Sequence, residues 1–176
     1  IVMAAASAVL AVVSIFSRIE DATLGLLVWG VYLVAVGLAH TVVLISSGQR
    51  AGWWTWWIGH ALMAVVIGVF TISFQATGSV ALLTWSIAVW SVIAGGSSLV
   101  QGFRQPRQTS LRSDWATVGG GTLFLGGLVM VVPAEVYWYL GLAGVWAAMV
   151  SVFLVIAVLS ARTAMADENG EQEGNS

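Results

Sequence analysis

Cysteine and lysine are absent from the 176-residue sequence, proline occurs only twice, and charged residues make up only 8 % of the chain. The absence of cysteine excludes a disulfide framework, a thiolate metal site and a cysteine nucleophile. Soluble domains carry roughly 25 % charged residues, so a chain with about a third of that charge is not an ordinary soluble globular protein. The six basic residues form no continuous basic face, which excludes nucleic acid as a partner.

Hydrophobic residues make up 59 % of the chain and fall into long uncharged runs. A helix that crosses the roughly 30 Å hydrocarbon core of a bilayer needs about 20 apolar residues. Six runs meet or approach this length: 1–16, 22–46, 53–74, 80–103, 115–132 and 136–160. The sequence therefore predicts an all-α polytopic membrane protein with six transmembrane helices in contact with membrane lipids.

The first run is short for a transmembrane span, and the sequence opens on Ile1 rather than on methionine. We therefore expect residues upstream of Ile1 that the sequence does not contain. A secretory signal peptide is the alternative, because residues 4–8 are small. A signal peptide also has a basic segment before its apolar run, and no such segment precedes this one.

Arginine sets the expected orientation, because cytoplasmic loops carry an excess of basic residues. Arg18 is the only arginine in the turns after the first, third and fifth runs. The turns after the second and fourth runs and the tail after the sixth hold the others: Arg50, Arg104, Arg107, Arg112 and Arg162. This bias predicts that both termini lie in the cytoplasm. We expect the membrane to be the bacterial inner membrane.

An internal repeat relates the runs to one another. Each even-numbered run contains an aromatic residue that is followed five positions later by a small one. The three pairs are Tyr32 with Gly37, Trp90 with Gly95, and Trp146 with Ser151. A shift of 58 residues superimposes the first two pairs, and the third follows after a slip of two residues. We predict one transmembrane domain, 1–162, of three tandem helical hairpins, about 1–50, 51–107 and 112–162.

Tryptophan and arginine gather near the predicted cytoplasmic ends of the helices. The tryptophans that follow the second run are Trp53, Trp54, Trp56 and Trp57. They suit a belt at the membrane interface, and they are also candidates for binding a partner or a lipid. The arginines Arg104, Arg107 and Arg112 set the topology and attract anionic lipid headgroups, or they dock a partner.

His40 and His60 lie well inside predicted spans. Each is ten residues from Arg50, so they should reach a similar depth on adjacent helices. Ionisable groups are costly in a membrane and often functional, which makes a proton relay one hypothesis. The alternative is that each neutral imidazole donates to a backbone carbonyl or to a serine or threonine. Two histidines supply too few ligands for a stable zinc site, so we predict no metal.

The acidic residues lie at the ends of the spans and in the tail. With two histidines and no embedded acid, the sequence offers no catalytic triad, and we predict neither catalytic residues nor a cofactor. The segment 163–176 contains four acidic residues and no basic one. Its composition predicts a disordered acidic cytoplasmic tail.

The tandem hairpins, with an aromatic and then a small residue in each even-numbered helix and an arginine that closes each hairpin, resemble the HdeD-like family of short-repeat membrane proteins. The closing arginines are Arg50, Arg104 and Arg162, and Pro133 lies in the outer turn of the third hairpin. The resemblance covers nearly all of the chain up to about Arg162. It implies six spans and, for the protein that names the family, a link to acid resistance. It implies no catalytic residues.

The scarcity of reactive groups and the abundance of contact surfaces favour a function by association. We predict a non-catalytic accessory or stabilising subunit of a larger membrane complex, or a stress-related membrane helper. Its partners are then other membrane protein subunits. The alternative is a small transporter or channel for protons or a small solute that uses His40 and His60.

Overall fold

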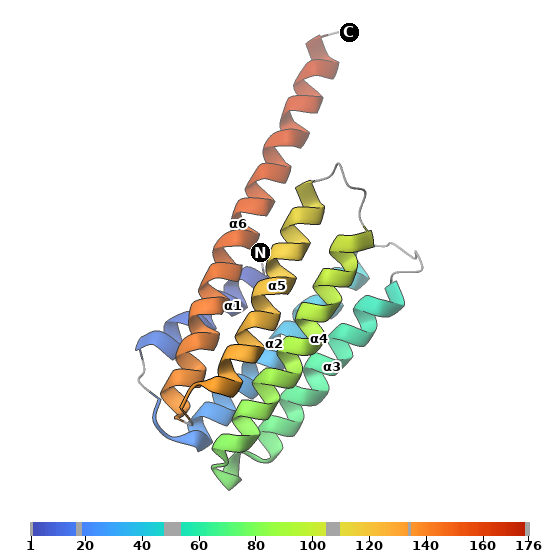
Figure 1. Ribbon diagram of the computed structural model, residues 1–176. Helices are drawn as coiled ribbons and strands as arrows, with labels where there is room; N and C mark the ends of the chain where they lie inside the picture. The colour runs from blue at the N-terminus through green and yellow to red at the C-terminus, as the bar shows by residue number, and fades with distance from the viewer. Residues whose placement is uncertain (1, 17–18, 48–53, 105–109, 134, 175–176) are drawn as a thin grey trace.

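The computed structural model describes residues 2–16, 19–47, 54–104, 110–133 and 135–174 (Figure 1). Its elements are α1 (Val2–Phe16), α2 (Ala22–Ser47), α3 (Trp54–Ser73), the 3₁₀ turn η1 (Gln75–Thr77), α4 (Val80–Arg104), α5 (Ser110–Val131) and α6 (Val136–Gly174). The six α-helices lie close to the six apolar runs of the sequence, which confirms the all-α fold class.

Polar residues in the turns start the helices that follow them. The Asp21 carboxylate accepts the backbone N–H of Thr23 at 2.8 Å, and the Ser79 hydroxyl accepts that of Leu82 at 3.2 Å. Both bonds satisfy donors that the first turn of a helix leaves unpaired. Gly78 closes η1 with φ of 57°, a left-handed conformation that favours glycine.

Within the described residues, three helices are long and apolar enough to cross a membrane, judged by length and composition. These stretches are Ala22–Ile45, Val80–Arg104 and Val136–Phe153. α3 and α5 contain shorter apolar stretches, Trp57–Ser73 and Trp115–Val131. A helix satisfies its own backbone hydrogen bonds, which is what a chain in hydrocarbon requires. The apolar helices indicate a membrane-embedded protein.

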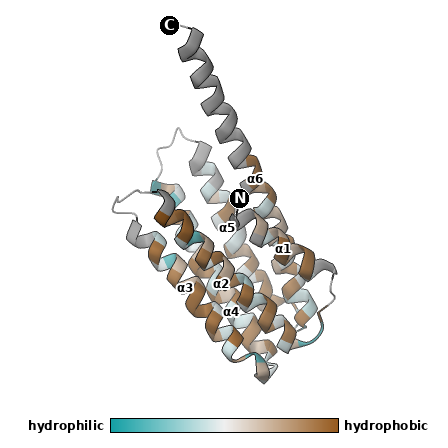
Figure 2. Ribbon diagram, turned by 180° about the vertical axis from the view of Figure 1, so that it is seen from behind, coloured by the Kyte–Doolittle hydropathy of each residue, from teal (hydrophilic) through white to brown (hydrophobic). Residues whose placement is uncertain are grey.

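The outer surface of the bundle is rich in large apolar side chains. Val131 is 80 % exposed, Ile45 73 % and Phe124 70 %. Figure 2 shows hydrophobic residues along the helices and hydrophilic ones mostly near the helix ends. Apolar surface of this extent suits contact with lipid or with another membrane protein rather than with water.

Three helices form the centre of the bundle, and three lie outside them. α2, α4 and α6 each contact the other two, whereas α1, α3 and α5 each contact two of the central helices. The most extensive contacts join α2 with α3, α4 with α5, and α1 with α6, so the first and last helices also pair. The pairs predicted as hairpins, α1–α2, α3–α4 and α5–α6, are neighbours with smaller contacts.

The aromatic and the small residue of an even-numbered helix contact different neighbours. A Cβ added to Gly95 of α4 would lie 2.8 Å from the carbonyl oxygen of Gly119 in α5, so the two backbones touch. Gly37 of α2 makes the equivalent contact with α3. A Cβ added to it would lie 2.7 Å from the carbonyl oxygen of Ala61. Trp90 instead reaches back to α3, where its ring lies 4.9 Å from that of His60.

The other two aromatic residues also reach the helix that precedes their own. Tyr32 of α2 interacts with the side chain of Ser7 in α1. The Trp146 ring of α6 lies over Gly121 of α5, where a Cβ would overlap the indole. The aromatic residue thus fills the looser contact to the preceding helix. The small residue allows the close approach to the next helix in the pairing.

Buried positions repeat along the central helices. A shift of 114 residues, two repeats less the two-residue slip, places seven buried positions of α6 on buried positions of α2. They are Val136, Tyr139, Leu140, Ala143, Gly144, Ala147 and Ser151, which fall on Ala22, Gly25, Leu26, Trp29, Gly30, Leu33 and Gly37. The repeat therefore encodes the same buried face in the two helices.

α6 is longer than its apolar run, because the helix continues to Gly174. The segment 163–174 belongs to α6, and the disordered acidic tail expected over 163–176 stays a prediction. Half of the residues in 163–176 are strong helix formers, chiefly glutamate and alanine, and the segment contains no proline. Charge and low hydropathy indicate exposure to water, but they do not by themselves end a helix.

We expect Gly95→Ala to destabilise the bundle, because the new methyl group would meet the α5 backbone and the Leu123 side chain. Overpacking of this kind costs about 1–3 kcal/mol. Gly96→Ala is the matched control, since a Cβ at Gly96 meets open space, and it should be neutral or slightly stabilising. Thermal unfolding of the purified protein in detergent compares them, and equal midpoints would contradict the described packing of α4 on α5.

Candidate functional site

Rings from four helices meet in the half of the bundle where α2 ends and α3 begins. The ring centroids of His40 in α2 and His60 in α3 lie 5.0 Å apart, with the planes at 63°. The Trp57 ring lies 5.5 Å from His40, and the Trp90 ring lies 4.9 Å from His60. Trp115 of α5 joins through Trp57, 5.7 Å away. These five residues form the His–Trp cluster.

The antiparallel pairing of α2 and α3 brings the two histidines together. His40 lies seven residues before the end of α2, and His60 lies six residues after the start of α3, so their depths match. Trp57 lies three residues before His60 and therefore shares its helix face. The equal spacing around Arg50 predicts this similar depth, and the structure places the two rings in contact.

Hydrogen-bond partners indicate which nitrogen carries the hydrogen in each neutral ring. His40 Nδ1 lies 2.9 Å from the Val36 carbonyl oxygen, which can only accept, so Nδ1 donates. The Ser97 hydroxyl donates to the Ala94 carbonyl at 2.8 Å, which uses its single hydrogen. His60 Nδ1, 3.2 Å from Ser97 Oγ, is then the donor of that bond. Both neutral rings therefore carry their lone pair on Nε2.

The cluster can accept a proton, but its groups do not form a metal site. His40 is only 7 % exposed, and His60 is half-buried. Among the residues that the structure describes, no three histidine, cysteine, aspartate or glutamate residues gather where they could hold an ion. A protonated imidazole here would lie within about 6 Å of a tryptophan ring, which is the range of a cation–π interaction.

The predicted tryptophan and arginine candidates have different outcomes. Trp57 packs in the cluster, and Arg104 is exposed at the end of α4. Two candidates lie outside the described residues: Trp53 and Arg107. Three more belong to helices, but their side chains lie outside the described part: Trp54, Trp56 and Arg112. A common docking surface for these residues therefore stays a prediction.

Sequence reasoning did not assign Trp90, Trp115 or Ser97 to the site. All three come from α4 or α5, whereas the spacing argument concerned only α2 and α3. A signal was present for Trp115, because the 58-residue shift aligns it with Trp57. Ser97 had no such signal, since its role depends on how α4 is rotated against α3.

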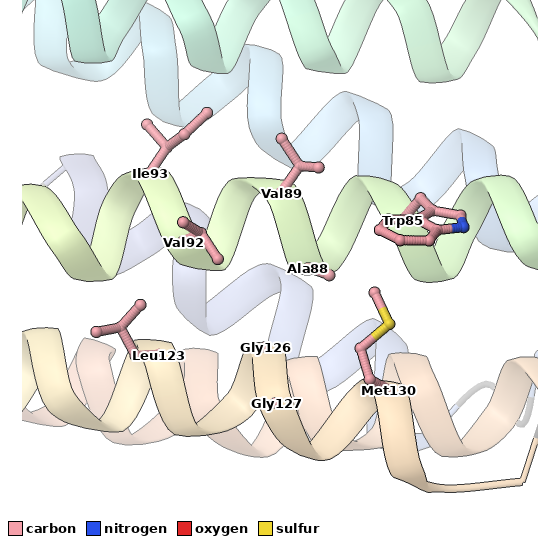
Figure 3. Close-up of a pocket in the computed structure, with 9 residues that line it drawn as sticks. All are labelled: Trp85, Ala88, Val89, Val92, Ile93, Leu123, Gly126, Gly127 and Met130. Carbon is pink, nitrogen blue, oxygen red and sulfur yellow. The ribbon is translucent and has the colours of Figure 1, made fainter.

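A second feature is an open apolar groove of about 480 Å³ between α4 and α5 (Figure 3). The residues that line it are Trp85, Ala88, Val89, Val92, Ile93, Leu123, Gly126, Gly127 and Met130. Trp85 and Met130 lie close to each other at one end (Figure 3), and Trp85 is 62 % exposed. A Cβ added to Gly127 would meet open space, so the glycine leaves the α5 side of the groove hollow.

Comparisons with protein-family models, with curated proteins and with solved structures return no match. The resemblance to HdeD-like proteins, drawn from the residues alone, therefore stays a prediction. The His–Trp cluster and the groove between α4 and α5 are therefore the features that bear on function.

We expect Ser97→Ala to destabilise the protein, because the N–H of His60 loses its acceptor. An unsatisfied buried donor costs about 1–3 kcal/mol. Ser98→Ala is the control, since the Ser98 hydroxyl bonds to the same Ala94 carbonyl as that of Ser97, at 2.9 Å. Thermal unfolding in detergent separates the two variants. A Ser98→Ala loss as large as that of Ser97→Ala would show that the bond to His60 contributes nothing.

Proposed function

We propose that the chain is an integral inner-membrane protein that acts by associating with other membrane proteins. In this proposal its helices make six spans, arranged as three tandem hairpins, and both termini face the cytoplasm. It serves as an accessory or stabilising subunit and performs no catalysis. The observation that carries the proposal is the apolar groove between α4 and α5, where Gly127 leaves the α5 side open.

The repeat shows that the groove is a local departure from the fold. Gly127 of α5 aligns with Val69 of α3, whose side chain is 51 % exposed. Trp85 of α4 aligns with Leu27 of α2. Relative to the α2–α3 pair, the α5 side has lost a side chain and the α4 side has gained an indole. The first change leaves open space on the α5 side, and the second places an indole on the wall of the groove.

A transmembrane helix of another subunit is the occupant that this groove fits. The lining is formed almost wholly by aliphatic side chains and glycines, and helices in lipid associate by packing closely over small residues. Trp85 supplies the large aromatic anchor that commonly dominates the energy of an interface. A partner helix would also cover Val92, which is 61 % exposed on the same face.

Gly127→Leu should abolish the association, because the new side chain would occupy the groove, and its Cβ meets open space. Gly120→Leu is the matched control, since Gly120 also faces open space on α5 but does not line the groove. Affinity purification in mild detergent with quantitative mass spectrometry measures partner stoichiometry. We expect the unmodified chain and Gly120→Leu to retain one stoichiometric membrane partner that Gly127→Leu loses. A monomer without a partner in all three samples would contradict the proposal.

The contact of His40 with His60 favours a second candidate, a small transporter or channel for protons or a small solute. Conduction needs a series of polar groups along the bundle. Thr71 and Thr122 are buried, but their hydroxyls donate to carbonyls of their own helices at 2.7 Å. These two hydroxyls are therefore bonded within their own helices, and the groove keeps association as the leading proposal.

The second candidate predicts that proteoliposomes containing the protein dissipate a proton gradient faster than empty vesicles. The double variant His40→Ala, His60→Ala should lose this flux, because both titratable rings are removed. Ser98→Ala should keep it, since its hydroxyl bonds to a backbone carbonyl of α4. Absence of flux from the unmodified chain, with the protein shown to be folded in the vesicles, contradicts the candidate.

A further inference from the structure

We propose that His40 and His60 together bind one proton, and that His60 holds it beside the ring of Trp90. The site is that of the second candidate function, on which the choice of residues rests, but proton binding requires no transport. The proton would be a ligand of the folded bundle, stored as one positive charge where α2, α3 and α4 meet.

His60 is the better placed of the two rings to carry the charge. Its Nδ1–H donates to Ser97 Oγ, which itself donates to a backbone carbonyl, so a charged ring polarises two hydrogen bonds in series. Its centroid lies 4.9 Å from that of Trp90 and 6.3 Å from that of Trp57. Indole rings at this range attract a cation through their π electrons. His60 is also more exposed than His40, and the proton arrives from water.

The same geometry disfavours a second proton. The two ring centroids are 5.0 Å apart, so two imidazolium ions would repel each other strongly. At an effective dielectric constant near 20, this repulsion weakens binding of the second proton by roughly a hundredfold. The pair therefore behaves as one site that takes one proton.

Charged residues on the surrounding helices are few. α2 and α3 contain no aspartate, glutamate, lysine or arginine. Arg104 of α4 is exposed and lies seven residues beyond Ser97. α5 contains Arg112 and Asp114, whose side chains lie outside the described part. In the described part of the site, tryptophan rings and hydrogen bonds are therefore the groups that stabilise the charge.

The test is ¹⁵N NMR of the histidine-labelled full chain in lipid nanodiscs across a pH titration. The chain has two histidines, so the spectrum contains two imidazoles, which His40→Gln and His60→Gln assign. Near neutral pH we expect both rings to carry hydrogen on Nδ1 and a bare Nε2. On acidification we expect His60 alone to gain a proton on Nε2 while the bundle stays folded.

Trp90→Leu should lower the proton affinity of His60 by roughly three- to thirtyfold, the range of a cation–π interaction. Trp146→Leu is the matched control, because it removes the equivalent indole of the third repeat, which packs on Gly121. The control should leave the titration of His60 unchanged. If Trp90→Leu does not fold, Trp90→Phe keeps a ring with a weaker π face, and a smaller shift in the same direction is expected.

Three results overturn the inference: uptake of two protons with similar affinity, hydrogen on Nε2 of either ring at neutral pH, or unfolding before any ring titrates. Equal effects of Trp90→Leu and Trp146→Leu on His60 overturn its cation–π part. A proton site without flux removes the transport candidate and leaves this inference standing. Loss of the proton site with partner binding intact leaves the association proposal standing.

Discussion

The rest of the structure depends on the close approach of helix backbones at glycine. Where Gly37 lies on the α3 backbone, and Gly95 on that of Gly119, an added methyl group would overlap main-chain atoms. Hydrocarbon is as apolar as the side chains, so in lipid the energy of helix association comes largely from such packing. The α2–α3 contact also sets the distance between His40 and His60. The same interaction that holds the bundle together therefore builds the candidate site.

The six helices follow from the sequence because hydrocarbon leaves a chain few alternatives: backbone groups must be paired within the segment. The pairing of the helices was harder to derive. Consecutive runs predict hairpins, but the tightest contacts lie between α2 and α3, α4 and α5, and α1 and α6. Choosing among neighbours requires knowing which face each glycine presents, and this depends on the rotation of every helix. α6 continues past its apolar run to Gly174, because a helix does not end where hydropathy falls.

The candidate site was half predictable for a related reason. Equal spacing from Arg50 places His40 and His60 at one depth, whereas the contacts of Trp90 and Ser97 depend on packing between repeats. The repeat is nevertheless informative where it fails. The 58-residue shift aligns the two histidines with serine and valine, and it aligns Val69 with the glycine of the groove. Both candidate sites thus coincide with departures from a pattern that otherwise serves packing.

α4 is the element that the two sites share. Trp90 belongs to the His–Trp cluster, while Val89 and Val92, its neighbours on the helix, line the groove. A charge on His60 would act on α4 through Trp90 and Ser97, and a partner helix would act on α4 through the residues that line the groove. Coupling between two binding events is reciprocal. Any change in partner affinity caused by the proton must therefore appear as an equal change in proton affinity caused by the partner.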